Sequence, residues 1–412
     1  MPQDTAFDSD VLIVGAGPAG LALATALADA GLHSLVLEQS PAAAIEQPAE
    51  DGRDIALTHR ARRILQQLGL WQRLPADAPA PLREAKVLDG DGKASLLNFS
   101  SQGTGLEALG WLVPNHLVRQ AAWQEASSRP QVTAHFEARV TGLGLQPDAG
   151  VVTLHDGRSL RAPLVVAADS RFSNVRRMAG IGASVHDFAR SVVVGRVAHE
   201  HDAGGIAWEC FRYGNTLALL PMNGRQCSAV ITVDSNQAPA WLALSDEEFA
   251  ARVQAQAPGA LGTLTPAGPR HHYPLVGVYA HRFTGHRFAL VGDAAVGMHP
   301  VTAHGYNFGL YGVEVLTQAL KAARTAGKDL GAAEVLARYG DVHRRTTLPT
   351  YLGTNAIVKL FTTEFGPARL ARQAVLTLSE KLPPFNRVVK AAITRQLTGR
   401  SGIAGLGGSG RG

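Results

Sequence analysis

The segment from Asp10 to Glu38 constrains the fold more than any other part of the sequence. An apolar run from Val11 to Val14 leads into Gly15-Ala16-Gly17-Pro18-Ala19-Gly20, apolar residues then recur at helical spacing, and a second apolar run ends at Glu38. Strand, glycine turn, helix and strand in this order predict a Rossmann-type unit that binds a dinucleotide.

Each residue type in this turn has a physical role. Gly15 lets the strand turn sharply, Gly17 lets backbone amides approach a pyrophosphate, and Gly20 lets the helix pack against the strand. The start of the helix adds unpaired N–H groups and a partial positive charge, so Ala16 and its neighbouring glycines are candidate pyrophosphate residues. Glu38 can accept both hydroxyls of an adenosine ribose and would repel a 2′-phosphate, which favours FAD or NAD over NADP.

Composition limits the other possibilities. A chain of 412 residues exceeds the size of one growing core, so at least two packed units are expected. Cys210 and Cys227 form no C-x-x-C pair, which argues against a dithiol reductase and predicts core thiols. The sequence shows neither a signal peptide nor an apolar run of about 18 residues, so we expect a cytoplasmic protein.

The net charge of +5 is concentrated near the end of the chain, where residues 365–412 contain eight basic residues and one acid. Apolar residues between Val388 and Leu397 recur at helical spacing among these charges, which suits a helix at an anionic membrane surface. A helix packed on the body with solvated charges, or a self-association contact, would fit equally well. The segment lacks the aromatic platforms of a nucleic-acid groove, so no nucleic-acid partner is expected.

The pattern of apolar runs predicts an α/β fold with an inserted antiparallel sheet. We expect a Rossmann-type FAD-binding domain from residues 1–80, 100–180 and 282–330, and a substrate domain from residues 81–99 and 181–281. Four strands between Val192 and Val233 form the inserted sheet, and 83–99 forms a hairpin. Residues 331–400 form a helical C-terminal segment, and 401–412 a glycine-rich disordered tail.

Several polar residues occur at predicted element boundaries. Arg53 precedes a predicted helix, where it is either solvated or close to a bound anion, and Arg119 lies one turn into the helix 115–126. Asp169 ends a buried strand, and so does Gly292-Asp293. His271-His272 reads as a loop pair, since no further ligand completes a metal site.

Together these motifs resemble the single-component FAD monooxygenases of the para-hydroxybenzoate hydroxylase type. The resemblance rests on the glycine turn, the Arg53 loop, Ala168-Asp169, and Gly292-Asp293-Ala294-Ala295 before Pro300 and a glycine-led helix. Asp54-Ile-Ala-Leu, placed in the second helix, Gly110-Trp-Leu-Val-Pro-Asn115 and Tyr273-Pro274-Leu275 resemble the ubiquinone-biosynthesis hydroxylases in particular.

The resemblance implies a role for each matching residue. The glycine turn would hold the FAD pyrophosphate and Glu38 the adenosine ribose, while Arg53 and Arg119 would reach the pyrophosphate and ribityl region. Asp293 would bind a ribityl hydroxyl, and Asp169 belongs to a motif linked to both FAD and NAD(P)H. The segment from Pro300 to Asn307 would lie beside the isoalloxazine ring, with backbone amides near Gly305 facing its pyrimidine edge.

The resemblance also implies the reaction. The expected activity is hydroxylation of the aromatic ring of a polyprenyl phenol in ubiquinone biosynthesis, with NAD(P)H and O2, through a flavin hydroperoxide. A soluble aromatic or polyketide substrate remains an alternative, as does a non-hydroxylating flavoprotein subunit of a quinone-synthesis complex. The lipid-soluble substrate suggests contact with the inner face of the membrane, and a homo-oligomer is a further option.

Three positions depart from the family pattern. Ser170 follows Asp169 where glycine is usual, Val296 replaces a histidine, and His304 precedes Gly305 in place of glutamine. His299 and His304 flank the expected flavin and are candidates for proton control, because histidine changes charge near neutral pH. Both are equally compatible with simple hydrogen bonding.

Overall fold

The computed structural model describes residues 6–89, 95–212, 214–298 and 305–362. Three of the predicted site residues, His299, Pro300 and His304, lie outside these ranges, as do the basic segment 365–412 and the predicted disordered tail. Within the described ranges, no helix is long and apolar enough to cross a membrane.

The predicted dinucleotide unit is present as β1 (Val11–Val14), α1 (Pro18–Asp29) and β2 (Ser34–Leu37), with β1 and β2 parallel. These strands belong to a six-stranded sheet, the parallel sheet, in the order β19-β20-β12-β1-β2-β8. Its other strands are β8 (Val132–His135), β12 (Leu164–Ala167), β19 (Thr284–Gly285) and β20 (Phe288–Leu290). Every residue of β1, β2, β12 and β20 is buried, as expected for a parallel sheet covered on both faces.

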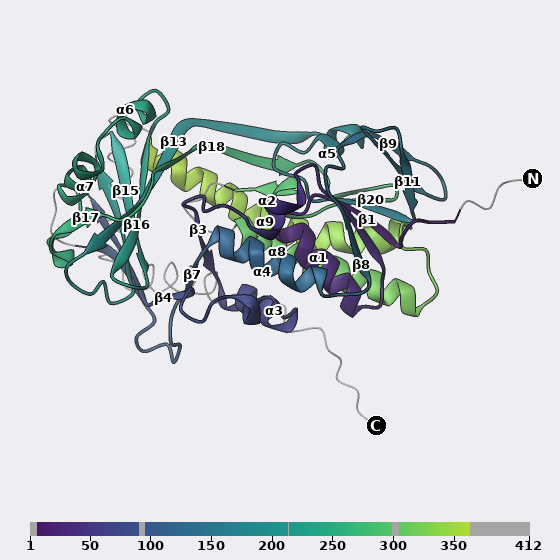
Figure 1. The fold of residues 1–412 in the computed structure, drawn as a ribbon, viewed down its shortest axis with the longest axis horizontal. Helices are drawn as coiled ribbons and strands as arrows, with labels where there is room; N and C mark the ends of the chain where they lie inside the picture. Colours follow the sequence, from purple (N-terminus) through teal and green to yellow (C-terminus); the bar gives the residue numbers. More distant parts are fainter. Residues whose placement is uncertain (1–5, 90–94, 213, 299–304, 363–412) are drawn as a thin grey trace, which may run out of the picture.

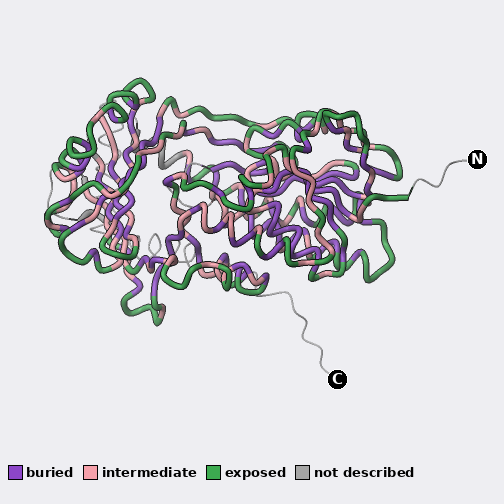
Figure 2. Tube along the Cα trace, viewed as in Figure 1, coloured by how far each residue is buried: buried purple, intermediate pink, exposed green. Residues whose placement is uncertain are grey.

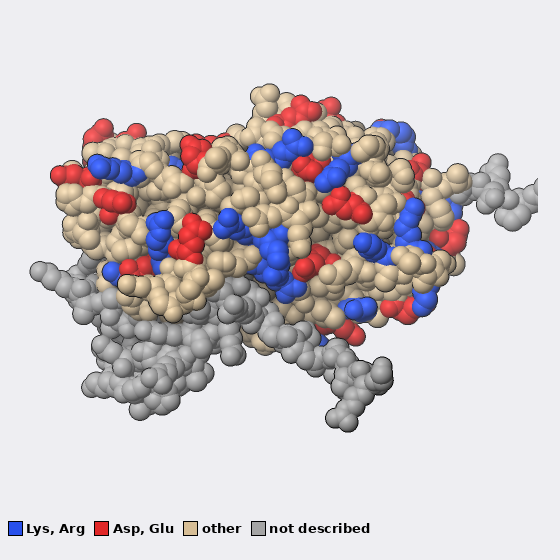
Figure 3. Space-filling view, turned by 90° about the horizontal axis from the view of Figure 1, so that it is seen from below, with Lys and Arg blue, Asp and Glu red and all other residues tan. Residues whose placement is uncertain are grey.

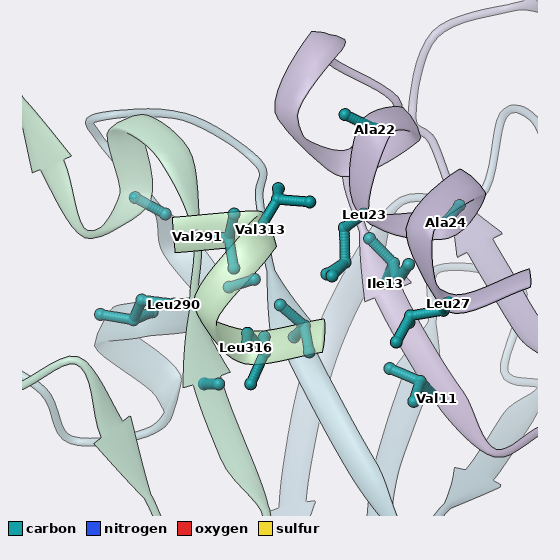
Figure 4. Close-up of a cluster of buried hydrophobic side chains, with 14 of the residues drawn as sticks. Val11, Ile13, Ala22, Leu23, Ala24, Leu27, Leu290, Val291, Val313 and Leu316 are labelled. Atoms are coloured by element: carbon teal, nitrogen blue, oxygen red, sulfur yellow. The ribbon is translucent and has the colours of Figure 1, made fainter. Parts of the chain in front are cut away.

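Two layers cover this sheet. Helices α4 (Asn115–Ser127) and α8 (Gly305–Thr325) pack against α1, and α9 (Ala333–Thr362) packs against α8. A small antiparallel sheet of β9 (Val140–Leu145), β10 (Gly150–Leu154) and β11 (Ser159–Ala162) contacts β12 and β1. Figure 4 shows the core between sheet and helices, where Ile13 of β1 lies beside Leu23 and Leu27 of α1, and Leu316 belongs to the neighbouring α8. Figure 2 shows that buried residues concentrate in this region.

A second, nine-stranded sheet, here the large sheet, has the order β21-β18-β13-β16-β15-β14-β5-β6, with β17 paired to β13. Its strands are mostly antiparallel, as predicted, but β5 pairs with β14 in parallel. The bounds are β5 (Glu84–Asp89), β6 (Ser95–Ser100), β13 (Ala183–His199), β14 (Ile206–Arg212), β15 (Asn215–Met222), β16 (Gln226–Asp234), β17 (Leu264–Pro266), β18 (His271–Ala280) and β21 (Val296–Gly297).

The two faces of the large sheet differ. One face packs under α6 (Ala238–Leu242) and α7 (Asp246–Gln254) and buries Trp208, Cys210 and Cys227 with Trp241 and Phe249. Both cysteines are therefore core thiols, as predicted, and burial raises the pKa of Cys227 to about 12. The opposite face, which we call the inner face, is turned toward the helices of the parallel sheet (Figure 1).

The remaining elements connect the two sheets. Strands β3 (Asp54–Leu57), β4 (Ala80–Leu82) and β7 (Gly110–Pro114) form a three-stranded sheet. The described chain also contains the helices α2 (Ala42–Glu46), α3 (His59–Gln67) and α5 (Asn174–Met178), and single helical turns at Trp71–Arg73, Gly259–Leu261 and Gly292–Ala294. On the face seen in Figure 3, charges of both signs are interspersed.

The structure corrects three expectations. Residues 54–57 form strand β3 rather than the start of a helix, because Ile55 and Leu57 pair with β7. His271 and His272 begin β18 rather than forming a loop. Strand β13 begins at Ala183, nine positions before the predicted strand, because its polar first half pairs with β18.

Candidate functional site

The three glycines of the turn occupy different environments. Gly15 has a φ of +109°, and a Cβ there would lie 2.6 Å from the Ala168 carbonyl oxygen. A Cβ on Gly20 would lie 2.1 Å from the Gly15 carbonyl oxygen. A Cβ on Gly17 would meet no atom within 4 Å. Gly15 and Gly20 are thus required by the fold itself, whereas Gly17 leaves open space at the start of α1.

This open space suits an anion. Gly17 is the N-cap of α1, no side chain caps the helix, and its first turn contains no acidic residue. Within the described residues, the first N–H groups and the positive end of the helix dipole therefore have neither a side-chain cap nor an acid in the same turn. The local structure fits a dinucleotide pyrophosphate.

Glu38 supports the turn directly. One carboxylate oxygen accepts the Ala16 N–H at 2.8 Å, and the other accepts the Ser40 N–H at 2.9 Å. The Ala16 amide is therefore directed at Glu38. Each carboxylate oxygen has a further lone pair, so these bonds leave Glu38 able to accept ribose hydroxyls.

Asp169 lies beside the same turn. Its Cα would be 2.8 Å from a Cβ on Gly15, and its Oδ2 accepts the Asn174 N–H at 3.0 Å. Its Oδ1 is buried and has no hydrogen-bond partner among the described residues. A buried carboxylate oxygen without a partner is uncommon in a native protein and is consistent with a ligand hydroxyl or amide at this point.

Asp293 is close to the starts of both α1 and α8. Gly292 has a φ of +65°, and a Cβ there would lie 2.9 Å from the Ala19 Cβ. A Cβ on Gly305 would lie 3.9 Å from the Asp293 Oδ1. The fold therefore gathers the glycine turn, Asp293 and Gly305 at the carboxyl ends of the parallel strands, where ligands of open α/β sheets bind.

Arg171 is a residue of this cluster that the sequence did not reveal. Its guanidinium donates to Asp293 at 3.0 Å and to the Val276 carbonyl oxygen at 3.1 Å. Arg171 lies two positions after Asp169, and this position next to a predicted site residue was the signal in the sequence that could have pointed to it. The pairing with Asp293, more than a hundred positions away, depends on the fold.

Asn307 has a connecting role. Its Oδ1 accepts the Thr58 N–H at 2.9 Å, and its Nδ2 donates to the Ala56 carbonyl oxygen at 2.8 Å. These bonds hold the first turn of α8 against β3 and the start of α3.

Arg53 lies beside the large sheet, and Arg119 lies on α4 close to α2. Arg53 pairs with Asp51 at 2.6 Å, and its guanidinium is 5.1 Å from the centre of the Tyr273 ring. Burial raises the pKa of Asp51, but Arg53 and Asn115 outweigh burial and hold that pKa below its ordinary value. Arg119 is half-buried and donates to the Ala44 carbonyl oxygen at 3.4 Å.

Comparison with known proteins agrees with this geometry. A family model described as "FAD binding domain" matches residues 8–345. The chain belongs to this family. It is an FAD-dependent monooxygenase of the para-hydroxybenzoate hydroxylase superfamily, as its sequence motifs predict.

Two curated relatives are similar over nearly their whole length. "Ubiquinone hydroxylase UbiM" of Neisseria meningitidis is 44% identical over 395 residues, which cover 95% of this chain and 85% of the relative. "Ubiquinone hydroxylase UbiL" of Rhodospirillum rubrum is 38% identical over 380 residues, which cover 92% of this chain and 88% of the relative.

Solved structures confirm the fold. The p-nitrophenol 4-monooxygenase of Pseudomonas putida has a TM-score of 0.74 at 20% identity and covers 95% of this chain and 98% of its own. Klebsiella pneumoniae HpxO, solved with FAD and uric acid, has a TM-score of 0.74 at 19% identity and covers 94% of this chain and 96% of its own.

Proposed function

We propose that this protein hydroxylates the aromatic ring of a polyprenyl phenol intermediate of ubiquinone biosynthesis, with FAD as cofactor and NAD(P)H and O2 as co-substrates. The observation that carries the proposal is the 44% identity to a ubiquinone hydroxylase over 95% of the chain. The second relative, at 38% identity, bears a ubiquinone hydroxylase name as well.

In this proposal, the residues near the glycine turn hold FAD. The N–H groups at the start of α1 receive the pyrophosphate above Gly17, and Glu38 accepts hydroxyls of the adenosine ribose. Asp293, oriented by Arg171, accepts a ribityl hydroxyl, and the buried Oδ1 of Asp169 accepts a further donor. Bound FAD, once reduced, supplies the activation of O2 that no side chain can provide.

The inner face of the large sheet suits an apolar substrate. Val192, Val194 and Leu275 form one apolar cluster there, and a second contains Leu82, Phe99 and Ala207. An isoprenoid chain gains free energy from such contacts at roughly 25 cal/mol for each Å² of apolar area buried. The same side chains keep water away from the ring that is hydroxylated.

The location of the substrate suggests where the enzyme works. We propose a cytoplasmic protein peripheral to the inner face of the membrane, with the basic segment 365–412 as the contact and with self-association or a quinone-synthesis complex as further options. Fractionation of cells at low and high salt tests this, because an electrostatic membrane contact weakens as salt rises.

The decisive experiment is the lipid-quinone mass profile of the source organism with the gene deleted and then restored. Loss of ubiquinone, with accumulation of an intermediate lacking one ring oxygen, is the expected result, and restoration should reverse it. The mass of the intermediate also identifies which modification step is missing. An unchanged profile in a strain without a second hydroxylase would contradict the proposal and favour a soluble aromatic substrate.

A further inference from the structure

The inner face of the large sheet carries a carboxyl group in an unusual position, that of Glu209 on β14. Its neighbours Trp208 and Cys210 belong to the core beneath α6 and α7. Because successive side chains of a strand point to opposite faces, Glu209 lies on the inner face. Ala207, two positions away on that face, packs with Leu82 and Leu109.

The register identifies what surrounds this carboxyl group. Glu209 pairs with Val87 on β5 and with Ala218 on β15. Ala218 pairs with Val230 on β16, which pairs with Val194 on β13. Directly opposed residues of neighbouring strands project from the same face, so Glu209 is an acid within a row of small apolar side chains.

Exposure shows that this row is not sealed from solvent. Glu209, Ala218 and Val230 each retain intermediate exposure, whereas Leu217, Leu219 and Ile231 on the opposite face are fully buried. Burial also raises the pKa of Glu209 to about 7, and burial is the sole cause of that shift. The Glu209 carboxyl is therefore desolvated by its apolar surroundings while the residue stays partly accessible.

Among the other titratable groups of the inner face, Arg190 pairs with Asp234 at 3.2 Å, and three more are engaged with the loop before β3. Arg196 pairs with Asp54 at 2.9 Å, the Tyr273 hydroxyl donates to the Asp51 carbonyl oxygen, and the His271 ring abuts Gly52. On β5 and β15, the described side chains that share the face of Glu209 are Ala85, Val87, Thr216, Ala218, Leu220 and Met222, none of which is acidic or basic. The register places Asp89 opposite Phe211, two positions beyond Val87 on β5.

We propose that Glu209 is a catalytic residue that accepts the ring hydroxyl proton of the phenol substrate; this rests on the proposed function. A phenol with an isoprenoid chain needs an apolar surface with one acceptor for its hydroxyl, which is what this row offers. As the ring is hydroxylated, the phenolic O–H bond breaks and the proton passes to the Glu209 carboxylate, which makes the ring more electron-rich. When aromaticity is restored, the ring C–H proton leaves to water and Glu209 returns its proton to the phenolic oxygen.

Kinetics provide the first test. Glu209→Gln removes the base but keeps the shape, so kcat should fall by roughly 100-fold while KM changes much less. In the unaltered enzyme, kcat should rise with pH through about 7, as the carboxyl ionises. This rise should be absent in Glu209→Gln and displaced in Glu209→Asp, which should recover part of the rate. Glu247→Gln, on the exposed part of α7, is the matched control and should leave the profile unchanged.

Binding to the oxidised FAD enzyme, without NAD(P)H, provides a readout independent of turnover. The probes are 2-prenylphenol and its O-methyl ether. Binding of each probe is measured by the change in flavin absorbance. The native enzyme should bind the phenol about tenfold more tightly than the ether, because the ether leaves a desolvated carboxylate without a donor. Glu209→Leu should lose this preference.

The outcomes separate the two proposals. If the native enzyme hydroxylates the phenol and Glu209→Gln retains both its rate and its pH profile, the role of Glu209 is refuted while the proposed function stands. If the native enzyme hydroxylates no prenylphenol, the proposed function itself fails. FAD content checks that each variant is folded, and should Glu209→Gln lose FAD, an unchanged pH profile of Glu209→Asp would overturn the role.

Discussion

At the scale of single residues, the glycine turn shows how one sequence pattern contains two kinds of requirement. Gly20 is imposed by packing, since its Cβ would overlap the Gly15 carbonyl oxygen, whereas the Cβ of a residue at position 17 would enter empty space. The φ of Gly17 is −70°, which any residue can adopt. Stability therefore constrains Gly20, and ligand binding constrains Gly17.

Alanine substitutions separate these requirements. Gly17→Ala should leave the melting temperature of the apoprotein nearly unchanged but reduce FAD occupancy to a small fraction, because the added methyl group occupies the proposed pyrophosphate position. Gly20→Ala should destabilise the apoprotein by about 1–3 kcal/mol through overpacking. Thermal unfolding and the flavin-to-protein absorbance ratio measure the two effects. Full FAD occupancy in Gly17→Ala would place the pyrophosphate elsewhere.

The sequence could predict this part of the site because its contacts are local. Gly15, Gly17 and Gly20 act within one turn, and Glu38 follows at the end of the next strand. The partners of Asp293 and Arg53 were beyond sequence reasoning, since Arg171 and Tyr273 reach them only through the completed fold. His299, Pro300 and His304 lie outside the described residues, and their assigned roles remain predictions.

At the scale of elements, the packing of α9 on α8 depends on a buried histidine. The His343 ring stacks on Tyr339 at 5.4 Å and lies near Phe283 and Tyr311, at 5.2 and 5.6 Å between ring centres. Burial, with a smaller contribution from the charge of Arg60, lowers the pKa of His343 to about 3. The ring is therefore neutral in the folded protein at every ordinary pH.

This histidine should make stability depend on pH. Its folded pKa lies below its unfolded value of about 6.5, so its contribution is complete above that pH and is lost progressively as the pH falls toward 3. The loss approaches about 4–5 kcal/mol at the acid end. His343→Phe should flatten the decline of the urea midpoint between pH 6.5 and pH 4. The exposed His155→Gln is the control, and equal slopes in all three proteins would contradict the assignment.

Periodicity predicted elements best where one face is simply buried. Strand β1 and helix α4 were predicted at nearly their observed bounds. Strand β3 was assigned to a helix because its four residues are too few to show alternation, and pairing with β7 determines its state. The first half of β13 was missed because its polar, exposed side chains give no apolar pattern.

At the scale of the whole molecule, a buried ion pair joins the large sheet to β3. The Asp54 side chain is 0% exposed and Arg196 is 11% exposed, and their nearest atoms are 2.9 Å apart. Burial raises the pKa of Asp54 in spite of Arg196. Burial also lowers the pKa of Arg196, but Asp54 and Glu50 outweigh it, so that pKa is raised. Asp54 is the more completely buried partner, so at Asp54 desolvation outweighs the attraction of Arg196. At Arg196, the attraction of the two carboxylates outweighs desolvation.

Replacing one partner of this ion pair should destabilise the protein more than replacing both partners. Arg196→Met leaves a buried carboxylate unpaired and should destabilise the protein by about 3–5 kcal/mol, whereas Arg196→Met with Asp54→Leu should recover most of that loss. The exposed pair Arg158 and Asp156 is the matched control, and its coupling should be much weaker because solvent screens the two charges. Urea unfolding of each double-mutant cycle measures both couplings. Similar coupling energies for the two pairs would show that burial does not strengthen the interaction between Arg196 and Asp54.

The order of strands in the parallel sheet has a consequence for synthesis on the ribosome. Strand β12 pairs with β1 on one side and with β20 on the other, yet β20 follows β12 by about 120 residues, after the whole large sheet. At about 5–20 residues per second, the free edge of β12 has no native neighbour for of the order of ten seconds. Because β12 is entirely apolar, the nascent chain exposes an unpaired strand edge that can pair with other chains through much of elongation. We therefore expect chaperones to bind this nascent chain because of its topology rather than because of low final stability.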